Sequence, residues 1–158
     1  MATPFRVDLL TPERSVFAGE ADEVSMRTEI GEITFLAQHE DFIGAADSTV
    51  VRIHATSSAG SDSDGSFVRV AVHGGIVHVD HDGLVLLASV AELGSDIDVE
   101  RARRALERAE ERLSSEGESR ERDGEDERAA GSRRADAPES AARRARTRLE
   151  AAGADAAA

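Results

Sequence analysis

The sequence predicts a mainly β N-terminal domain, a flattened β-sandwich or barrel of about ten short strands, followed by an α-helical hairpin. Two observations predict this order. Apolar and polar residues alternate in short segments through residues 1–93, as they do in half-buried strands. From residue 94 onward, alanine, arginine and glutamate recur at helical spacing. We therefore expect a β-sandwich domain over residues 1–93 and a two-helix region over residues 94–153.

The predicted strands are separated by turn residues. Gly74-Gly75 and His81-Asp82-Gly83 are each expected to form a turn. Segments 49–54 and 67–72 are expected to pair as a hairpin across the long polar link 57–66. The segments that read as strands are 5–10, 23–27, 30–36, 49–54, 67–72, 76–79 and 84–88.

Beyond the boundary, each of two predicted helices carries one narrow apolar stripe. Ser95 or Asp96 is the expected cap of the first helix, and Asp98 and Glu100 lie in its first turn, where the helix dipole favours negative charge. The second helix is expected after Pro138. The stripes consist of Ala102, Ala105, Leu106, Ala109 and Leu113 in the first helix, and of Ala141, Ala142, Ala145, Leu149 and Ala152 in the second.

The rest of the C-terminal region has little apolar surface to bury. Residues 114–137 contain no apolar residue larger than alanine before Pro138, which predicts a flexible acidic and Ser-rich linker. We expect residues 154–158 to form a disordered tail. Because both stripes consist mostly of alanine, the hairpin is marginal by itself and is expected to separate or to dock on another surface.

Composition and charge exclude several classes of function. The 158 residues include 32 acidic residues and 19 arginines with no lysine, for a net charge of −13, so we expect no nucleic-acid partner. Cysteine is absent, which excludes disulfides and thiolate sites. No apolar run approaches the roughly 20 residues of a membrane-spanning helix, and the N-terminus lacks a signal-peptide pattern. We expect a cytosolic protein, or one held at a membrane by another molecule.

No arrangement of residues indicates a catalytic or metal centre. The sequence lacks a phosphate-binding loop that ends in lysine, a nucleophile elbow and an H-E-x-x-H motif. His73 and His78 have opposite parity on the predicted strands, so they are not expected to bind a metal together with His81. Asp62 and Asp64 lack the other ligands of a calcium loop. We interpret them as acidic residues of the polar link.

Five motifs occur in an order that is typical of one family. The last of them, Ile97-Asp98-Val99-Glu100-Arg101-Ala102, fits the pattern I/L-D-x-x-R-A. The others are Leu9 to Gly19, which ends in F-x-G; residues 31–39, similar to G-E-L-G-I-L-P-G-H; residues 73–79, which contain G-G-x-x-x-V; and the apolar strand 84–88. Together they resemble the epsilon subunit of the bacterial F-type ATP synthase over about residues 4–113, and more weakly over residues 139–150.

The resemblance implies a non-catalytic subunit of the central stalk. The β-sandwich would bind the gamma subunit and lie on the ring of c subunits, so that proton transport is coupled to ATP synthesis. This places the protein peripherally at the cytoplasmic face of the bacterial cell membrane. The C-terminal helices would switch between a compact form and an extended form that reaches the alpha and beta subunits and inhibits ATP hydrolysis.

The resemblance also implies candidate site residues. Glu32 and His39 match family positions at the c-ring contact, although residues 37–41 are Ala-Gln-His-Glu-Asp where the family has P-G-H-A-P. Some bacterial members bind a regulatory ATP between the two helices, and no other cofactor is implied. The matching residues are Asp98 and Arg101 in the first helix and Arg144 and Arg148 in the second.

Two alternatives stay open. Arginines at i and i+4, such as Arg144 and Arg148, project from one helix face and can bind phosphate oxygens bidentately. They can equally belong to a solvated charged face, with Asp98 near a helix cap. For the whole chain, the alternative to a synthase subunit is a free-standing β-sandwich adaptor whose helical tail recognises an unrelated partner.

Overall fold

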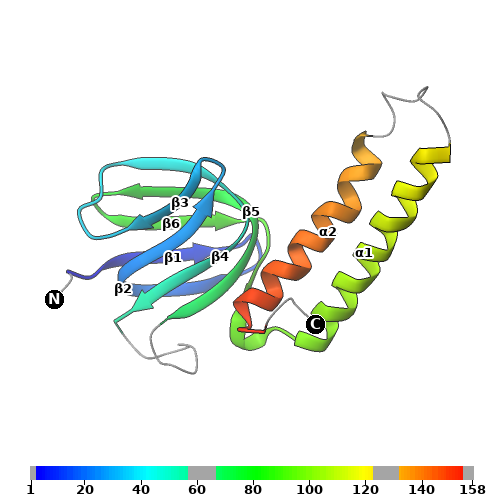
Figure 1. The fold of residues 1–158 in the computed structure, drawn as a ribbon. Helices are drawn as coiled ribbons and strands as arrows, with labels where there is room; N and C mark the ends of the chain where they lie inside the picture. The colour runs from blue at the N-terminus through cyan, green and yellow to red at the C-terminus, as the bar shows by residue number, and fades with distance from the viewer. Residues whose placement is uncertain (1–2, 57–66, 123–131, 155–158) are drawn as a thin grey trace.

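The chain folds into a β-sandwich followed by a hairpin of two helices, as the sequence predicts (Figure 1). A computed structural model of the chain describes residues 3–56, 67–122 and 132–154, with the backbone alone for 116–122 and 132–137. This part of the chain contains seven strands, a short 3-10 helix and two α-helices: β1 Phe5–Leu10, β2 Ser15–Thr28, β3 Gly31–Phe35, β4 Phe42–Ala55, β5 Val68–Asp80, β6 Gly83–Ala88, β7 Ala91–Leu93, η1 Gly94–Asp96, α1 Val99–Arg122 and α2 Ser132–Ala151.

The strands close into a flattened barrel. β1 pairs in parallel with β6, and β5, β4 and β2 follow as antiparallel neighbours until β2 returns to pair with β1. β3 adds to β2 at one side, and the short β7 adds to β5 at the other. The predicted hairpin of segments 49–54 and 67–72 is confirmed, because Thr49 pairs with Val72 and Ile53 with Val68. The link between them, with Asp62 and Asp64, lies outside the described residues.

Three strands are longer than predicted, which is why the described residues hold seven strands and not about ten. β2 and β4 each span 14 residues and β5 spans 13. β4 pairs with β5 along most of its length, whereas β2 and β5 change partner along the strand: β2 pairs first with β1 and then with β3 and β4. The first half of β5 pairs with β7 and the second half with β6.

The predicted turn at Gly74-Gly75 is wrong, because β5 continues through both glycines where its partner changes. Gly74 has a φ of 76°. A Cβ atom on Gly75 would lie 2.5 Å from the carbonyl oxygen of Leu87. Glycine allows both the positive φ and the close backbone approach, so the pair bends the strand without ending it.

Aliphatic side chains fill the barrel. Alternation along β4 places Val51 and Ile53 inside, whereas Arg52 is exposed. Burial of each large side chain contributes about 1.5–3 kcal/mol, so this core supplies most of the hydrophobic stability. Its fully buried members include Val7, Leu9, Val24, Phe35, Val51, Ile53, Val68, Val70, Val72, Val77, Leu84 and Leu86.

A second apolar cluster joins the helices to the barrel. α2 lies between the sandwich and α1 and packs on β4 and β5 (Figure 1). The residues of the predicted stripes are buried or partly buried here, together with Val50 and Ala71 from the sheet and Ile97 before α1. Because most of the buried helical residues are alanines, this interface buries less apolar surface than the barrel. No helix in the described residues is long and apolar enough to cross a membrane.

The predicted cap of the first helix, Ser95 or Asp96, is wrong by two or three residues. Asp98 is the cap: its Oδ1 accepts the Arg101 N–H at 2.9 Å, and its carbonyl oxygen accepts the Ala102 N–H at 3.0 Å. Ser95 and Asp96 lie in η1, which an extended Ile97 separates from α1. The hydrogen bond to Arg101 satisfies one of the free N–H groups at the helix start.

Both helices extend further into residues 114–137 than predicted. α1 continues to Arg122, and α2 begins at Ser132 with Pro138 inside it. Arginine, glutamate and alanine have high helix propensity, which favours helix even where large apolar residues are absent. Residues 123–131, and 155–158 of the predicted tail, lie outside the described part of the chain.

Candidate functional site

The boundary found in the sequence folds into a pocket where β7, η1, α1 and α2 meet. We call it the junction pocket. Its volume is about 300 Å³. Three carboxylates and three guanidinium groups line it, with no excess of either sign. They belong to Glu92, Asp96, Asp98, Arg101, Arg108 and Arg148.

The pocket gathers three of the four residues predicted for a nucleotide site: Asp98, Arg101 and Arg148. The fourth, Arg144, does not line it, and its Nη1 donates to Ser140 Oγ at 3.2 Å. The structure therefore places the predicted residues of α1 beside Arg148 near the end of α2, but it leaves Arg144 outside the pocket.

Sequence reasoning missed Glu92 and Arg108. Arg108 lies seven residues after Arg101, two helical turns along the same face of α1, so the spacing alone could have indicated it. Glu92 lies on β7, a three-residue strand that no alternation pattern could identify.

Arg148 and Glu92 join α2 to the sandwich. Arg148 Nε donates to both carboxylate oxygens of Glu92 at 3.2 Å, and its Nη2 donates to one of them at 2.7 Å. The hydrogen bond from Arg148 lowers the pKa of the half-buried Glu92 carboxyl. A bidentate arginine–carboxylate pair fixes orientation as well as distance. In this conformation Arg148 therefore holds the second helix in place.

His73 is buried beside this ion pair. Only 7% of the residue is exposed, and neither ring nitrogen has a hydrogen-bond partner among the described residues. Burial and the charge of Arg148 lower the pKa of the His73 imidazole from 6.5 to about 4, against the opposing effect of Glu92. Arg144 also disfavours the protonated ring. The ring is neutral near neutral pH.

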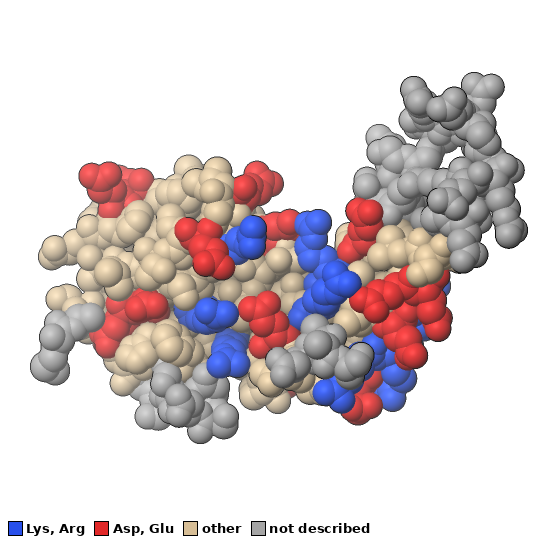
Figure 2. All heavy atoms as spheres, viewed as in Figure 1, with Lys and Arg blue, Asp and Glu red and all other residues tan. Residues whose placement is uncertain are grey.

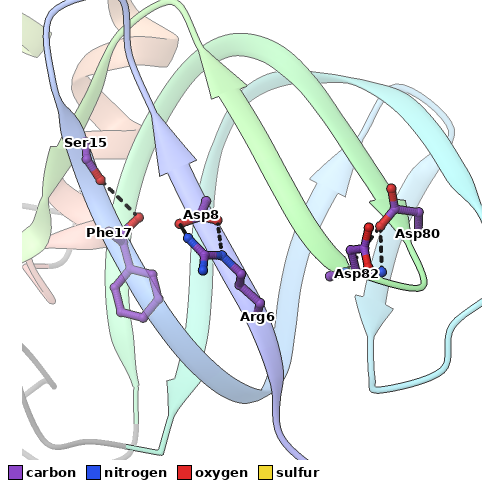
Figure 3. A network of polar contacts seen from close by, with 7 residues as sticks. Arg6, Asp8, Ser15, Phe17, Asp80 and Asp82 are labelled. Atoms are coloured by element: carbon purple, nitrogen blue, oxygen red, sulfur yellow. Dashed lines mark hydrogen bonds and ion pairs between the residues drawn. The ribbon is translucent and has the colours of Figure 1, made fainter.

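The histidines considered for metal binding lie apart. His73 is buried, whereas His78 is exposed, with its Nδ1 3.8 Å from Asp80. His81 lies in the β5–β6 turn, where its ligand atom and those of Asp80 and Asp82 lie within 4.8 Å of one another. Asp80 Oδ1 already accepts the Asp82 N–H at 2.8 Å (Figure 3), so this carboxylate stabilises the turn.

The two residues predicted at the c-ring contact lie toward opposite ends of β3. Glu32, the second residue of β3, is exposed and pairs in register with Arg27 of β2. His39 follows the strand, and its ring packs edge-on against Phe35 with a centroid distance of 5.0 Å. His39 Nδ1 donates to the carbonyl oxygen of Glu40 at 2.7 Å, which fixes the ring orientation and assigns the proton to Nδ1.

The turn before His39 contains a residue in the left-handed region. Gln38 has a φ of 63°. Glycine adopts this conformation at no steric cost, and the resembling family sequence has glycine here. A side chain at such a position costs roughly 1–2 kcal/mol. Thus the sharp turn forms here in spite of the glutamine.

Apolar side chains are exposed on the outer face of β4, β5 and β6. Ile43, Ile76 and Leu87 expose 71%, 52% and 55% of their surface. The register places Ile76 directly between Ala45 and Leu87, and His78 directly between Ile43 and Val85. Clustered exposed aliphatic residues mark interaction surfaces. We call this set the outer apolar patch: Ile43, Ala45, Ile76, His78, Val85 and Leu87.

Comparison with known proteins points to one family. Residues 4–94 match the family model of the β-sandwich domain of the ATP synthase delta/epsilon chain. The chain is 43% identical over 109 residues to the ATP synthase epsilon chain of Streptomyces griseus, covering 69% of this chain and 82% of that one. It is 44% identical over 107 residues to the epsilon chain of Halalkalibacterium halodurans, covering 68% and 74%. For the epsilon chain of Desulforamulus reducens, the identity is 38% over 117 residues, covering 74% and 83%.

Two solved structures contain chains of similar fold. One is the mitochondrial ATP synthase of Euglena gracilis, comprising OSCP, F1 and c-ring, with a TM-score of 0.67 and 19% identity over 94% of this chain and 81% of that chain. The other is the central stalk and c-ring of the Tetrahymena thermophila mitochondrial ATP synthase, with a TM-score of 0.57 and 14% identity over 96% and 98%. At these identities the similarity is one of fold.

Proposed function

Because the chain belongs to the ATP synthase epsilon-chain family, whose members are structural and not catalytic subunits, we propose that it connects the gamma subunit to the c-ring in the central stalk. In this position it helps to couple proton transport to ATP synthesis. It is a peripheral subunit at the cytoplasmic face of the bacterial cell membrane, bound there through its partners.

The outer apolar patch is the observation that carries this proposal. Its side chains come from three neighbouring strands and are exposed together, although the chain has a net charge of −13. Ile76 and Leu87 are about half exposed, so burial of the rest of each side chain against a partner contributes roughly 0.8–1.5 kcal/mol. A lasting protein contact accounts for such a surface. We assign the patch to the gamma subunit.

The c-ring contact is assigned to the region of β3. Glu32 presents an exposed carboxylate, and the half-buried His39 ring is held in place by Phe35 and by the hydrogen bond from its Nδ1 to Glu40. Such polar groups at the rim of a contact provide orientation more than affinity.

Co-purification tests the gamma assignment. Ile76→Glu and Leu87→Glu place a charge in the outer apolar patch and should abolish recovery of the chain with the gamma subunit. Val90→Glu is the matched control, because Val90 is 45% exposed and lies outside the patch. Recovery of both patch variants at the level of the control, with unchanged circular dichroism, would rule out the patch as the gamma contact.

The weak attachment of the hairpin supports a regulatory role for the C-terminal helices. The apolar interface is mostly alanine, and the Arg52–Glu150 ion pair at 3.4 Å is exposed and contributes little. The Arg143–Asp47 pair is exposed as well, whereas the Arg148–Glu92 pair is bidentate and half-buried. We propose that this docked form permits rotation, and that an extended form contacts the alpha and beta subunits and inhibits ATP hydrolysis.

Truncation tests the inhibitory role. A chain that ends at residue 95 keeps the barrel, so it should assemble normally with the synthase. ATP hydrolysis by the complex should then rise, because the inhibitory helices are missing. Unchanged hydrolysis in a fully assembled complex would reject the role.

The junction pocket supports a second candidate function, the binding of a regulatory ATP. Asp98, Arg101 and Arg148 converge there with Arg108, and about 300 Å³ is at the lower end of the range for small-molecule sites. Phosphate oxygens would share or replace Glu92 on Arg148. Calorimetry of the full chain with ATP is the test. Absence of saturable heat at millimolar ATP, or equal heat with Arg101→Ala, would remove this function.

A further inference from the structure

A second concave site lies on the sandwich side of α2, separate from the junction pocket. It is a groove of about 410 Å³ between α2 and the strands β2, β3 and β4. None of its lining residues lines the junction pocket. Four arginines from three elements line it: Arg27 of β2, Arg52 of β4, and Arg143 and Arg146 of α2. We call it the arginine groove.

The arginine groove gathers four guanidinium groups on an acidic protein. Its four guanidinium groups face two carboxylates, those of Glu32 and Glu150, although the chain as a whole has a net charge of −13. Arginine side chains are visible where the sandwich meets the helices (Figure 2). Asp47 and Glu110 pair with two of these guanidinium groups from outside the lining, so an anion enters by exchange with carboxylates.

The guanidinium group of Arg27 is available to a ligand, and those of the other three arginines are held by exposed ion pairs that a ligand can replace. Arg27 makes no side-chain hydrogen bond or ion pair with the described residues; only its backbone N–H is bonded, to Thr49 Oγ1 at 3.2 Å. Arg52 makes a single exposed contact with Glu150 at 3.4 Å. The partners of Arg143 and Arg146 are Asp47 and Glu110, neither of which lines the groove. Exposed ion pairs of this kind contribute about 0–1 kcal/mol, so a multivalent anion can compete with them.

The chemistry of the lining defines the class of ligand. Guanidinium groups bind phosphate through paired N–H donors, and hydroxyl groups of Ser48 and Thr34 add neutral donors to the same groove. Several guanidiniums spread over one groove suit an anion with adjacent phosphate groups better than a single carboxylate. We propose that the arginine groove binds a polyphosphate chain, either free or as part of a nucleotide.

Such a ligand would contact the sandwich and α2 at the same time. Arg27 and Arg52 belong to the barrel, whereas Arg143 and Arg146 move with the hairpin. A ligand that needs both pairs binds only the docked form and therefore stabilises it, by linkage. This effect on the hairpin rests on the proposed two-state role of the C-terminal helices, but binding itself does not.

Calorimetry of the full chain with pyrophosphate, ATP and adenosine tests the proposal. Pyrophosphate and ATP should both bind at millimolar concentration or below, and adenosine should not. Arg27→Ala should weaken both about tenfold or more, because one charge-assisted contact contributes roughly 1.5–3 kcal/mol. Arg14→Ala is the matched control, since Arg14 is exposed in the β1–β2 turn and makes no side-chain contact with the described residues.

The outcomes separate this groove from the junction pocket. Loss of binding with Arg27→Ala and retention with Arg101→Ala supports the proposal. The reverse pattern places the phosphate chain in the junction pocket and overturns it, as does an absence of saturable heat with pyrophosphate. Binding of ATP without pyrophosphate would also overturn it. These results are independent of co-purification with the gamma subunit, so the two proposals fail separately.

Discussion

Lowering the pH below about 6.5 should weaken the docking of α2 on the sandwich, because the buried His73 ring takes up a proton much less readily than an exposed ring does. The charged groups around the ring are Arg144 and Arg148 of α2 and Glu92 of β7. Both arginines oppose protonation, and burial adds to their effect. A decrease in pH is therefore enough to test this effect in the natural chain, without a mutation.

The sign of the effect follows from the two states. The docked ring has a pKa lowered to about 4, whereas an exposed ring titrates near 6.5. Above pH 6.5 the ring is neutral in both states, so His73 does not reduce the free energy of docking. As the pH falls from about 6.5 toward about 4, only the undocked ring gains a proton, and docking weakens. Solvent at the junction screens part of the effect, so near pH 5.5 we expect docking to lose about 1 kcal/mol, or roughly five- to tenfold in the equilibrium.

Glu92 titrates in a different window. The hydrogen bond from Arg148 lowers the pKa of Glu92 below its usual 4.5. Its contribution to docking is therefore present above that value and is lost only as the pH falls further. A loss of docking between pH 6.5 and about 4.5 is consequently attributable to His73.

A distance measurement provides the assay. The chain has no cysteine, so Glu13→Cys on the β1–β2 turn and Glu139→Cys on α2 introduce two unique labelling sites at exposed positions. Energy transfer between the dyes should fall as the pH is lowered through 6. His73→Phe keeps a ring of similar size and cannot be protonated, so its docking should not change over this range. A pH response as large in His73→Phe as in the natural chain would refute the reasoning.

Three substitutions test other parts of the structure by urea unfolding or by the same dye pair. Gly94→Ala should make the docking of α2 less favourable by about 1–3 kcal/mol, because its Cβ would clash with the carbonyl oxygen of Ala151; unchanged energy transfer would contradict this contact. Gln38→Gly should raise the free energy of unfolding by about 1 kcal/mol by removing the left-handed strain, and a decrease of that size would be the opposite result. Asp98→Ala should lower the free energy of unfolding by about 1 kcal/mol through loss of the helix cap, whereas Asp96→Ala should have little effect. Equal losses in the two variants would contradict the assignment of the cap to Asp98.

The sequence contained enough information for the order of parts and for the buried stripes. Alternation in segments 49–54 and 67–72 predicted their pairing correctly, because each has one face in the core. Helical spacing predicted Leu106 and Leu149 as buried residues for the same reason. Where one face of a strand or helix is buried, the spacing of its apolar residues predicts which structure it forms.

Features that depend on tertiary contacts could not be predicted in this way. Gly74-Gly75 looks like a turn, but pairing of β5 with β6 keeps the strand continuous through it. The cap moved from Asp96 to Asp98 because η1 comes between the barrel and α1. The pairing of Arg148 with Glu92 joins residues 56 positions apart and has no local signal.

The central claim, that this chain couples rotation to the c-ring, is tested most directly by ATP-driven proton pumping. The synthase would be depleted of the chain and then supplemented with the natural chain, Ile76→Glu or Val90→Glu. The natural chain and Val90→Glu should restore pumping per ATP hydrolysed, whereas Ile76→Glu should not. A depleted complex that pumps as many protons per ATP as the supplemented one would contradict the account.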